Sequence, residues 1–440
     1  MKAAQNHVFI GITIILAGMV IALTAIFLFG IDKVSVPDAK DYLFASEEIL
    51  KGNSYPRQGA LPFFRAPLYP IFISLIWIIF PYSIASIKIC QAILHALTGY
   101  FIYKSGSELF AKTTPAILGA IFCLLNPFLV IHTTDIQTET LFTFLISVAF
   151  FISVRIYRKN TNYKILSGIL AIVWAVAALC RPSALVIGLI SIILLIFLKQ
   201  KPFEPLKFLR ESLLSVLCFF IVIIPWTLYN RYSIGEWILI NDASGYALWA
   251  SNHPESIKLW EHKFTTSIEF TEYSNFITAT LASNKIEEWK DTQNYTSLSL
   301  SQRERLWQKE SFKNAYENPY ITLRLIMWKT WGFWRPYLNI QAYPYRAVIY
   351  SGILLSLLYL FSLLGFFRLW QENAVRQFMV LFIVYIVVTT LLHSVVYSMM
   401  RYRIPFIDPY MCMFAGLGLY HLYVKCYALA CSNRINLRVL

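Results

Sequence analysis

Charged residues are scarce in this chain of 440 residues: only 14% are Asp, Glu, Lys or Arg, whereas 58% are hydrophobic. An ordinary soluble domain carries about 25% charged residues, so the composition excludes that class and is typical of a polytopic helical membrane protein. The net charge of +14 would suggest nucleic-acid binding in a soluble protein. Here the basic residues lie largely in short loops between apolar runs, so we expect them to orient the chain in a lipid bilayer, with no nucleic-acid partner.

Nucleotide-binding motifs are also missing. The sequence contains neither a Walker A motif nor G-x-G-x-x-G, and no predicted cytoplasmic loop is long enough to fold a nucleotide-binding domain. ATP-driven transport and direct use of a cytoplasmic nucleotide sugar are therefore not expected. The seven cysteines include no CxxC pair, and their spacing suits neither a zinc site nor a disulfide framework.

Ten apolar runs are long enough, or nearly so, for the roughly 20 residues that a helix needs to cross a bilayer. They lie at about 8–30, 84–103, 114–131, 140–156, 165–180, 183–198, 212–229, 346–367, 378–397 and 404–424. A further apolar segment, Pro67 to Phe80, is short and begins with two prolines, so we expect it to be interfacial or re-entrant. The predicted fold is an all-α polytopic membrane bundle of about 10–11 helices.

Three parts of the chain follow from this pattern. Residues 1–229 form a predicted N-terminal transmembrane module whose first loop spans 31–66. Residues 230–343 form an extracytoplasmic insert that ends in an aromatic juxtamembrane helix, and residues 344–440 supply the C-terminal membrane helices and a basic cytoplasmic tail.

The loops rich in Lys and Arg, such as 155–164, should be cytoplasmic. Counting crossings from them places Asp38 and Asp41, after the first helix, on the same outer face as Asp135 and Glu139. Carboxylates at the edge of hydrocarbon are costly and usually functional. We therefore expect a multi-pass protein of the inner membrane whose active site faces the periplasm or exterior.

The spacing of these acids favours a shared site. Asp38 and Asp41 are spaced i, i+3, and Asp38 and Tyr42 are spaced i, i+4, so they share a face if the segment is helical. Asp135 and Glu139 are also spaced i, i+4. Structural roles remain open, because Asp38 could cap a helix and an acid such as Glu139 suits the first turn of one.

Arginines at the outer face run against the orientation rule and need a reason. Arg181 lies between two apolar runs, and Arg401 and Arg403 follow His393 near the last helix pair. A lipid phosphate would explain them, and interfacial snorkelling is the alternative. Transfer of a group from a lipid-phosphate donor needs cations for the leaving phosphate and a carboxylate base for the acceptor hydroxyl. With one base and no second carboxylate that must act as a nucleophile, we expect inversion at the sugar carbon.

Several short motifs follow one another along the chain in a characteristic order. They are Asp38-x-x-x-Tyr42, Arg65-x-Pro67-x-Tyr69-Pro70, Thr138-Glu139-Thr140-Leu141-Phe142, Arg181-Pro182-Ser183-Ala184-Leu185, Pro225-Trp226-x-x-x-Asn230-Arg231 and Arg401-Tyr402-Arg403-x-Pro405. Their order resembles that of polyprenyl-phosphate-sugar-dependent glycosyltransferases of the GT-C superfamily. The resemblance is strongest to family 39, the bacterial relatives of protein O-mannosyltransferases and of the lipid A aminoarabinose transferase.

The resemblance implies a GT-C-type bundle and a hexosyl- or pentosyltransferase of the EC 2.4 type. Asp38 matches the catalytic acid of the first loop, although Ala39 follows it where many relatives carry a second acid. Other candidates follow by role. The predicted catalytic residues are Asp38, Asp41 and Glu139; those for the donor phosphate are Arg401, Arg403, Arg65 and Arg181; and those for substrate binding are Tyr42, Tyr69, Asp135, His393 and Tyr402.

The expected partners are a polyprenyl-phosphate-sugar donor, a glycan, lipid or protein acceptor, and the bilayer. The acids could hold a divalent metal ion or share protons, and the sequence leaves both open. A secondary transporter or a lipid or glycan flippase is the alternative, since intramembrane acids and arginines suit it too. The lack of paired half-sequences and the gathering of charges at one face weigh against that alternative. A third hypothesis is that the protein is a non-enzymatic scaffold.

Overall fold

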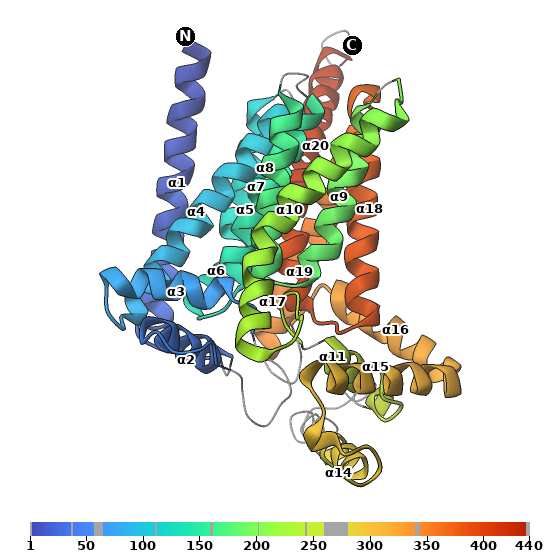
Figure 1. Cartoon of the computed structure of the whole chain (residues 1–440). Helices are drawn as coiled ribbons and strands as arrows, with labels where there is room; N and C mark the ends of the chain where they lie inside the picture. Colours follow the sequence, from blue (N-terminus) through green and yellow to red (C-terminus); the bar gives the residue numbers. More distant parts are fainter. Residues whose placement is uncertain are drawn as a thin grey trace.

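The computed structural model describes residues 2–36, 38–56, 65–110, 112–158, 162–200, 202–242, 244–258, 280–338 and 344–436. Long helices run roughly side by side as a bundle, and shorter helices gather at one end of it (Figure 1). The all-α class expected from the composition is confirmed. A helical bundle is the natural solution for an apolar chain, because hydrocarbon offers no partner for backbone N–H and C=O groups.

Seven helices of the described residues are long and apolar enough to cross a membrane. They are α1 (Lys2–Phe29), α4 (Ile84–Phe110), α7 (Glu139–Arg158), α8 (Tyr163–Cys180), α10 (Pro205–Ile234), α17 (Tyr345–Trp370) and α18 (Asn373–Val395). The shorter apolar helix α9 (Ser183–Lys199) and the more polar α20 (Asp408–Asn436) lie in the same bundle (Figure 1).

Two of the predicted runs are broken. The run at 114–131 forms α5 (Thr113–Leu125) and α6 (Pro127–Thr134), which meet at 47°. Pro127 lacks an N–H and starts α6, while the side chain of Asn126 accepts a hydrogen bond from the N–H of Phe128 at 3.0 Å. The run at 404–424 is likewise divided between α19 (Met400–Phe406) and α20.

The segment Pro67 to Phe80 forms α3 (Leu68–Ile79), a helix of only 12 residues. In Figure 1 it lies next to α2 (Ala39–Leu50) at the end where α4 begins. The chain thus reaches α4 without crossing the bundle again, as the sequence predicts.

Close glycine contacts hold the C-terminal helices together. A Cβ added at Gly365 in α17 would overlap the carbonyl of Phe414 in α20, and one at Gly418 would overlap the carbonyl of Phe361. Small residues of this kind let two membrane helices approach to backbone contact. The position of α20 relative to α17 is therefore fixed by backbone packing.

The insert contributes α11 (Ser244–Asn252), α14 (Ala282–Gln293), the 3₁₀ turn η2 (Tyr295–Ser297), α15 (Leu300–Glu317) and α16 (Pro319–Trp334). Its own core is aromatic and includes Trp249, Trp289 and Trp307. The buried Lys329 of α16 donates to Asn252 Oδ1 at 2.8 Å and to the carbonyl of Val395 at 3.0 Å. These bonds tie α11 and α16 to the end of α18.

Candidate active site

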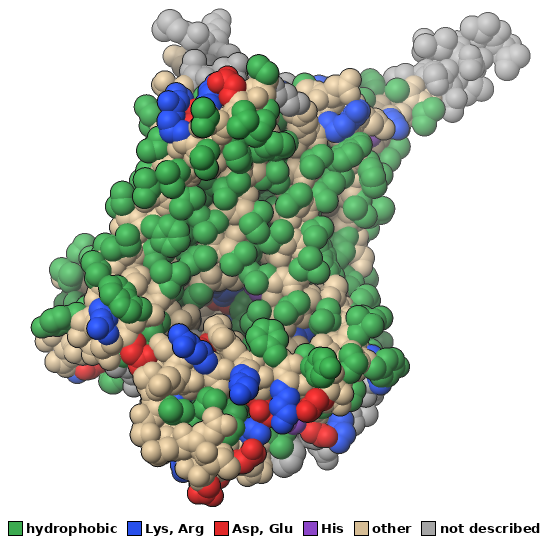
Figure 2. Space-filling view, turned by 45° about the vertical axis from the view of Figure 1, so that its right-hand side comes forward, with side chains coloured by type: hydrophobic (Ala, Val, Ile, Leu, Met, Phe, Trp, Pro, Cys, Tyr) green, Lys and Arg blue, Asp and Glu red, His purple; other side chains and the backbone are tan. Residues whose placement is uncertain are grey.

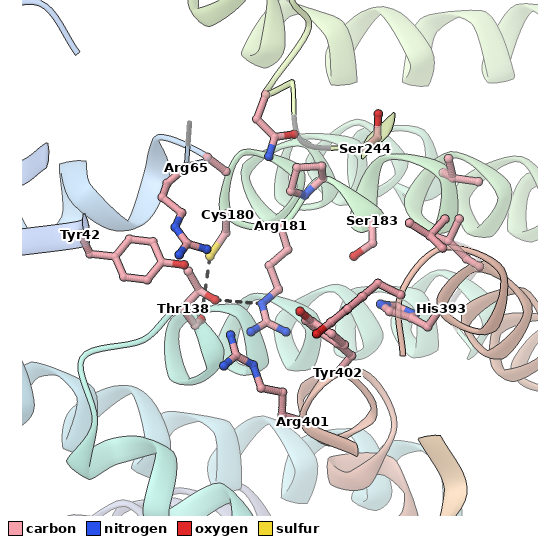
Figure 3. Close-up of a pocket in the computed structure, with 17 residues that line it drawn as sticks. Tyr42, Arg65, Thr138, Cys180, Arg181, Ser183, Ser244, His393, Arg401 and Tyr402 are labelled. Atoms are coloured by element: carbon pink, nitrogen blue, oxygen red, sulfur yellow. Dashed lines mark hydrogen bonds between the residues drawn. The ribbon is translucent and has the colours of Figure 1, made fainter. Parts of the chain in front are cut away.

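A cavity of about 390 Å³ opens where the insert meets the bundle. Its walls come from α2, the α8–α9 turn, α18, α19 and the insert (Figure 3). Figure 2 shows a hollow at the boundary between the hydrophobic band and the polar end of the molecule. The lining residues are Tyr42, Arg65, Ala66, Thr138, Cys180, Arg181, Pro182, Ser183, Val186, Asn241, Ser244, Leu392, His393, Val396, Tyr397, Arg401 and Tyr402.

Arg401 joins the two acidic stretches. One guanidinium nitrogen donates to Asp38 Oδ2 at 2.9 Å, and Nε lies 3.2 Å from Glu139 Oε1. Glu139 also lies 2.5 Å from a guanidinium nitrogen of Arg181. The three segments are far apart in sequence, so this contact exists only in the folded chain.

Arg65 extends the cluster on the other side of Asp38. Its guanidinium lies 2.9 Å from Asp38 Oδ1 and 2.7 Å from Asp41 Oδ2. Acids and arginines therefore alternate in a continuous line. We call this set the acid–arginine chain; in order it comprises Asp41, Arg65, Asp38, Arg401, Glu139 and Arg181.

The two principal acids differ in their surroundings. The side chain of Asp38 is 26% exposed, whereas that of Glu139 is 1% exposed. Burial alone would raise the pKa of Asp38, but the guanidinium groups of Arg65 and Arg401 outweigh it and hold the pKa below its ordinary value. Asp38 is therefore an ionised carboxylate in this state.

Local structure explains where these acids lie. Asp38 precedes the first residue of α2, yet its side chain makes no capping bond to the described backbone. It turns toward Arg65 and Arg401 instead. Glu139 is the first residue of α7, where the helix dipole also favours an acid.

Contacts on several sides hold the side chain of Arg181 in place, but one of its guanidinium nitrogens makes no hydrogen bond to the described residues. Its side chain packs between the rings of Phe142 and Tyr402, each 5.5 Å away, and Nε donates to Thr138 Oγ1 at 2.9 Å. Among the described residues its buried NH1 nitrogen has no hydrogen-bond partner. A buried donor left without a partner is costly, so this nitrogen is suited to an anionic ligand.

Arg403, predicted to bind the donor phosphate, does not reach the cavity. It is fully buried, pairs with Asp408 at 2.8 Å, and donates to the carbonyls of Phe333 and Arg335. Arg401 and Arg403 are two residues apart on one helix, so they cannot share a face. Arg403 instead fastens the end of α16 to the start of α20.

Five other predicted residues are absent from the cavity lining, namely Asp38, Asp41, Glu139, Tyr69 and Asp135. The three acids Asp38, Asp41 and Glu139 adjoin the cavity through their partners Arg65, Arg181 and Arg401, which do line it. Tyr69 is fully buried below Tyr42, and its hydroxyl donates to Gln91 Oε1 at 2.6 Å. Asp135 is absent from the lining set, and its carbonyl accepts a bond from the same Gln91 at 2.8 Å. Gln91 thus supports the floor of the site from α4.

The remaining predictions fall on the cavity wall. Tyr42, Tyr402 and His393 all line it. The Nδ1 of His393 lies 2.8 Å from the carbonyl of Thr389, which can only accept, so Nδ1 carries a hydrogen. The cavity is also lined by four polar residues to which the sequence motifs give no role: Ser183, Asn241, Ser244 and Tyr397. Only Ser183 lay within a recognised motif.

The acids do not fit a divalent metal ion. Asp38, Asp41 and Glu139 are each paired with an arginine, and Arg401 lies between Asp38 and Glu139, where a bridging cation would have to bind. Within the described ranges, no group of three or more His, Cys, Asp or Glu side chains is arranged for a metal. Here guanidinium groups supply the positive charge.

Comparison with known proteins agrees with this architecture. Residues 64–229 match the family described as dolichyl-phosphate-mannose-protein mannosyltransferase. The matched range contains Arg65, Glu139 and Arg181, whereas Asp38 and Arg401 lie outside it. No curated protein matches the chain.

Solved structures share the fold at low sequence identity. Archaeal oligosaccharyltransferase AglB from Archaeoglobus fulgidus, in complex with an inhibitory peptide and a dolichol-phosphate, has a TM-score of 0.52 and 11% identity over 97% of this chain and 52% of that one. The oligosaccharyltransferase of the same organism, in complex with Zn and sulfate, has a TM-score of 0.53 and 12% sequence identity. That match covers 96% of this chain and 51% of the other. The chain spans about half the length of these proteins. It is a multi-pass membrane protein with a GT-C-type fold, and its residues 64–229 are similar to the family described as dolichyl-phosphate-mannose-protein mannosyltransferase.

Proposed function

We propose that the chain is an inverting membrane glycosyltransferase that moves a sugar from a polyprenyl-phosphate donor to an acceptor hydroxyl at the outer face of the inner membrane. The family domain and the GT-C-type fold support a membrane glycosyltransferase. The observation that carries the finer proposal is the acid–arginine chain beside a cavity of about 390 Å³ at the edge of the apolar band.

Arg181 and Arg401 are the proposed ligands of the donor phosphate. Both line the cavity, and the NH1 nitrogen of Arg181 has no partner among the described residues. As the bond between the sugar and the phosphate breaks, negative charge grows on the phosphate oxygens. Guanidinium groups already fixed at that position stabilise this charge without reorganisation.

Asp38 is the proposed general base. It takes the proton of the acceptor hydroxyl while the new bond to the sugar carbon forms and the bond to phosphate breaks, leaving polyprenyl phosphate. In the free protein Arg401 and Arg65 lower the basicity of Asp38. A donor phosphate that draws Arg401 away would raise this basicity when it is needed. A single displacement of this kind inverts the sugar carbon.

The donor's apolar tail would leave the cavity between α9 and α18. Val186 of α9 and Leu392 of α18 line the cavity, and their neighbours Ile190 and Leu391 are exposed on the outer faces of these helices. A polyprenyl chain therefore meets an apolar surface from the cavity to the lipid. On the opposite side Asn241 and Ser244 of the insert offer polar contacts for the acceptor, whose class stays open.

The experiment uses the purified protein in lipid nanodiscs with a labelled polyprenyl-phosphate sugar, and measures release of polyprenyl phosphate. Asp38→Asn should abolish release, whereas Asp32→Asn, at an exposed acid just before this site, should leave it unchanged. Full turnover by the Asp38 variant would refute the assignment of the base. Movement of the lipid across the bilayer without bond cleavage would instead favour a flippase.

A further inference from the structure

A second cavity lies at the other end of the bundle, between α8 and α10. It has a volume of about 340 Å³. Figure 1 shows that this is the end where α1 begins and α20 finishes, away from α11 and α16. The lining residues are Tyr163, Lys164, Ser167, Gly168, Arg210, Glu211, Leu214, Ser215 and Cys218.

The cavity is a groove that follows the two helices. Its lining on α10 runs from Arg210 to Cys218, which is about 12 Å along a helix axis. Small side chains leave the space open: a Cβ added at Gly168 would meet only the Sγ of Cys218, at 3.6 Å. The neighbouring Leu213 and Leu217 are 55% and 51% exposed on α10, so the groove borders the surface that lipid covers.

Two cations, Lys164 and Arg210, and one carboxylate, Glu211, lie at one end of this groove. The nearest carboxylate to Lys164 is Glu211 at 3.8 Å. Glu211 is buried and already accepts bonds from the Tyr163 hydroxyl at 2.7 Å and from Gln200 at 2.9 Å. Among the described residues Arg210 has no ion pair. Positive charge is thus available where the groove reaches the polar end of the bundle.

We propose that this groove binds an anionic phospholipid of the adjacent leaflet. The lipid phosphate would lie between Lys164 and Arg210, and the first part of an acyl chain would lie along Gly168, Ser215 and Cys218. Basic pockets between membrane helices bind anionic head groups in this way. The apolar length of the groove favours a lipid over free phosphate, which would occupy only the charged end.

The test compares binding of phosphatidylglycerol and phosphatidylcholine to the purified full chain by native mass spectrometry. We expect the wild type to retain phosphatidylglycerol in preference to phosphatidylcholine. In the double variant Lys164→Ala/Arg210→Ala, this preference should fall about tenfold. Lys207→Ala is the matched control, because Lys207 is a half-buried cation of the same helix outside the groove, paired with Glu204 at 3.4 Å. Size-exclusion chromatography checks that each variant is folded.

A second pair of variants separates a lipid from free phosphate. Gly168→Leu and Cys218→Leu fill the groove from either helix and keep both cations, so each should lower retention of phosphatidylglycerol. Unchanged retention in both variants, together with displacement by inorganic phosphate, would overturn the lipid proposal in favour of a phosphate site. Equal retention of the two lipids by the wild type would overturn it as well.

Discussion

Asp38 and Glu139 both pair with Arg401, but Asp38 is the more accessible of the two acids, with 26% of its side chain exposed. The Glu139 side chain is 1% exposed and lies between Arg401 and Arg181. A carboxylate in that position orients two guanidinium groups and cannot reach an acceptor hydroxyl. We therefore assign Glu139 a positioning role under the proposed function.

Steady-state kinetics should separate these roles. Asp38→Asn removes the base and should lower kcat by about 10²–10⁴-fold with little change in the donor KM. Glu139→Gln leaves the base in place but loosens the two arginines, so it should raise the donor KM several-fold and lower kcat less than Asp38→Asn does. A Glu139 variant with an unaltered donor KM and a kcat as low as that of Asp38→Asn would contradict the distinction.

The pH profile should report the charges beside Asp38. The base works only when ionised, so kcat/KM falls as the pH drops through the pKa of Asp38. Arg65 and Arg401 hold this pKa below its ordinary value against the effect of burial. Arg65→Gln removes one of these charges, so the acidic limb should move to higher pH. Lys40→Gln, which removes an exposed cation from the same segment, should not move it.

At the scale of elements, α17 and α20 depend on backbone contact at Gly365. Gly365→Ala places a methyl group against the Phe414 carbonyl and should destabilise the protein by about 1–3 kcal/mol. Gly352→Ala is the matched control on the same helix, because its Cβ would meet only the Tyr337 side chain at 3.6 Å. Thermal unfolding in detergent should show a lower midpoint for the first variant alone. Equal unfolding midpoints for the two variants would contradict the prediction, because α17 and α20 would then accommodate the added methyl group with no loss of stability.

The break between α19 and α20 also decides which arginine takes part in the site. Arg403 and Asp408 are both fully buried and bonded to each other across this break. That pair, with the carbonyls of Phe333 and Arg335, holds α16 close to the cavity. The insert is thereby positioned as a wall of the site.

At the scale of the whole molecule, the first loop and the chain ends lie at opposite ends of the bundle (Figure 1). Combined with the positive-inside rule, this predicts that the C-terminal end is cytoplasmic and the first loop is not. A fluorescent protein fused to the C-terminus should be fluorescent, and a phosphatase that is active only outside the cytoplasm should be active when inserted at Gly52. The reverse pattern would place the candidate site on the cytoplasmic side.

The amino-acid sequence predicts most of the helices, because apolar runs in hydrocarbon must satisfy their backbone hydrogen bonds internally. The divisions of the runs at 114–131 and 404–424 are visible only in the structure. The sequence also marked most of the acids and arginines of the site, since charges at the edge of a membrane segment stand out against an apolar background. It did not separate Arg401 from Arg403, because both belong to one motif.

The pairing of these charges follows from the folded arrangement of the helices and not from the sequence pattern. Arg401 meets Asp38, 363 residues earlier in the chain, through the packing of α2, α7 and α19. The packing also buried Arg403 with Asp408 and brought Asn241 and Ser244 of the insert to the cavity wall. Hydrophobicity and local hydrogen bonding depend on residues that are close in the sequence, so the sequence predicts them. The partner of a charged side chain depends instead on which helices lie side by side.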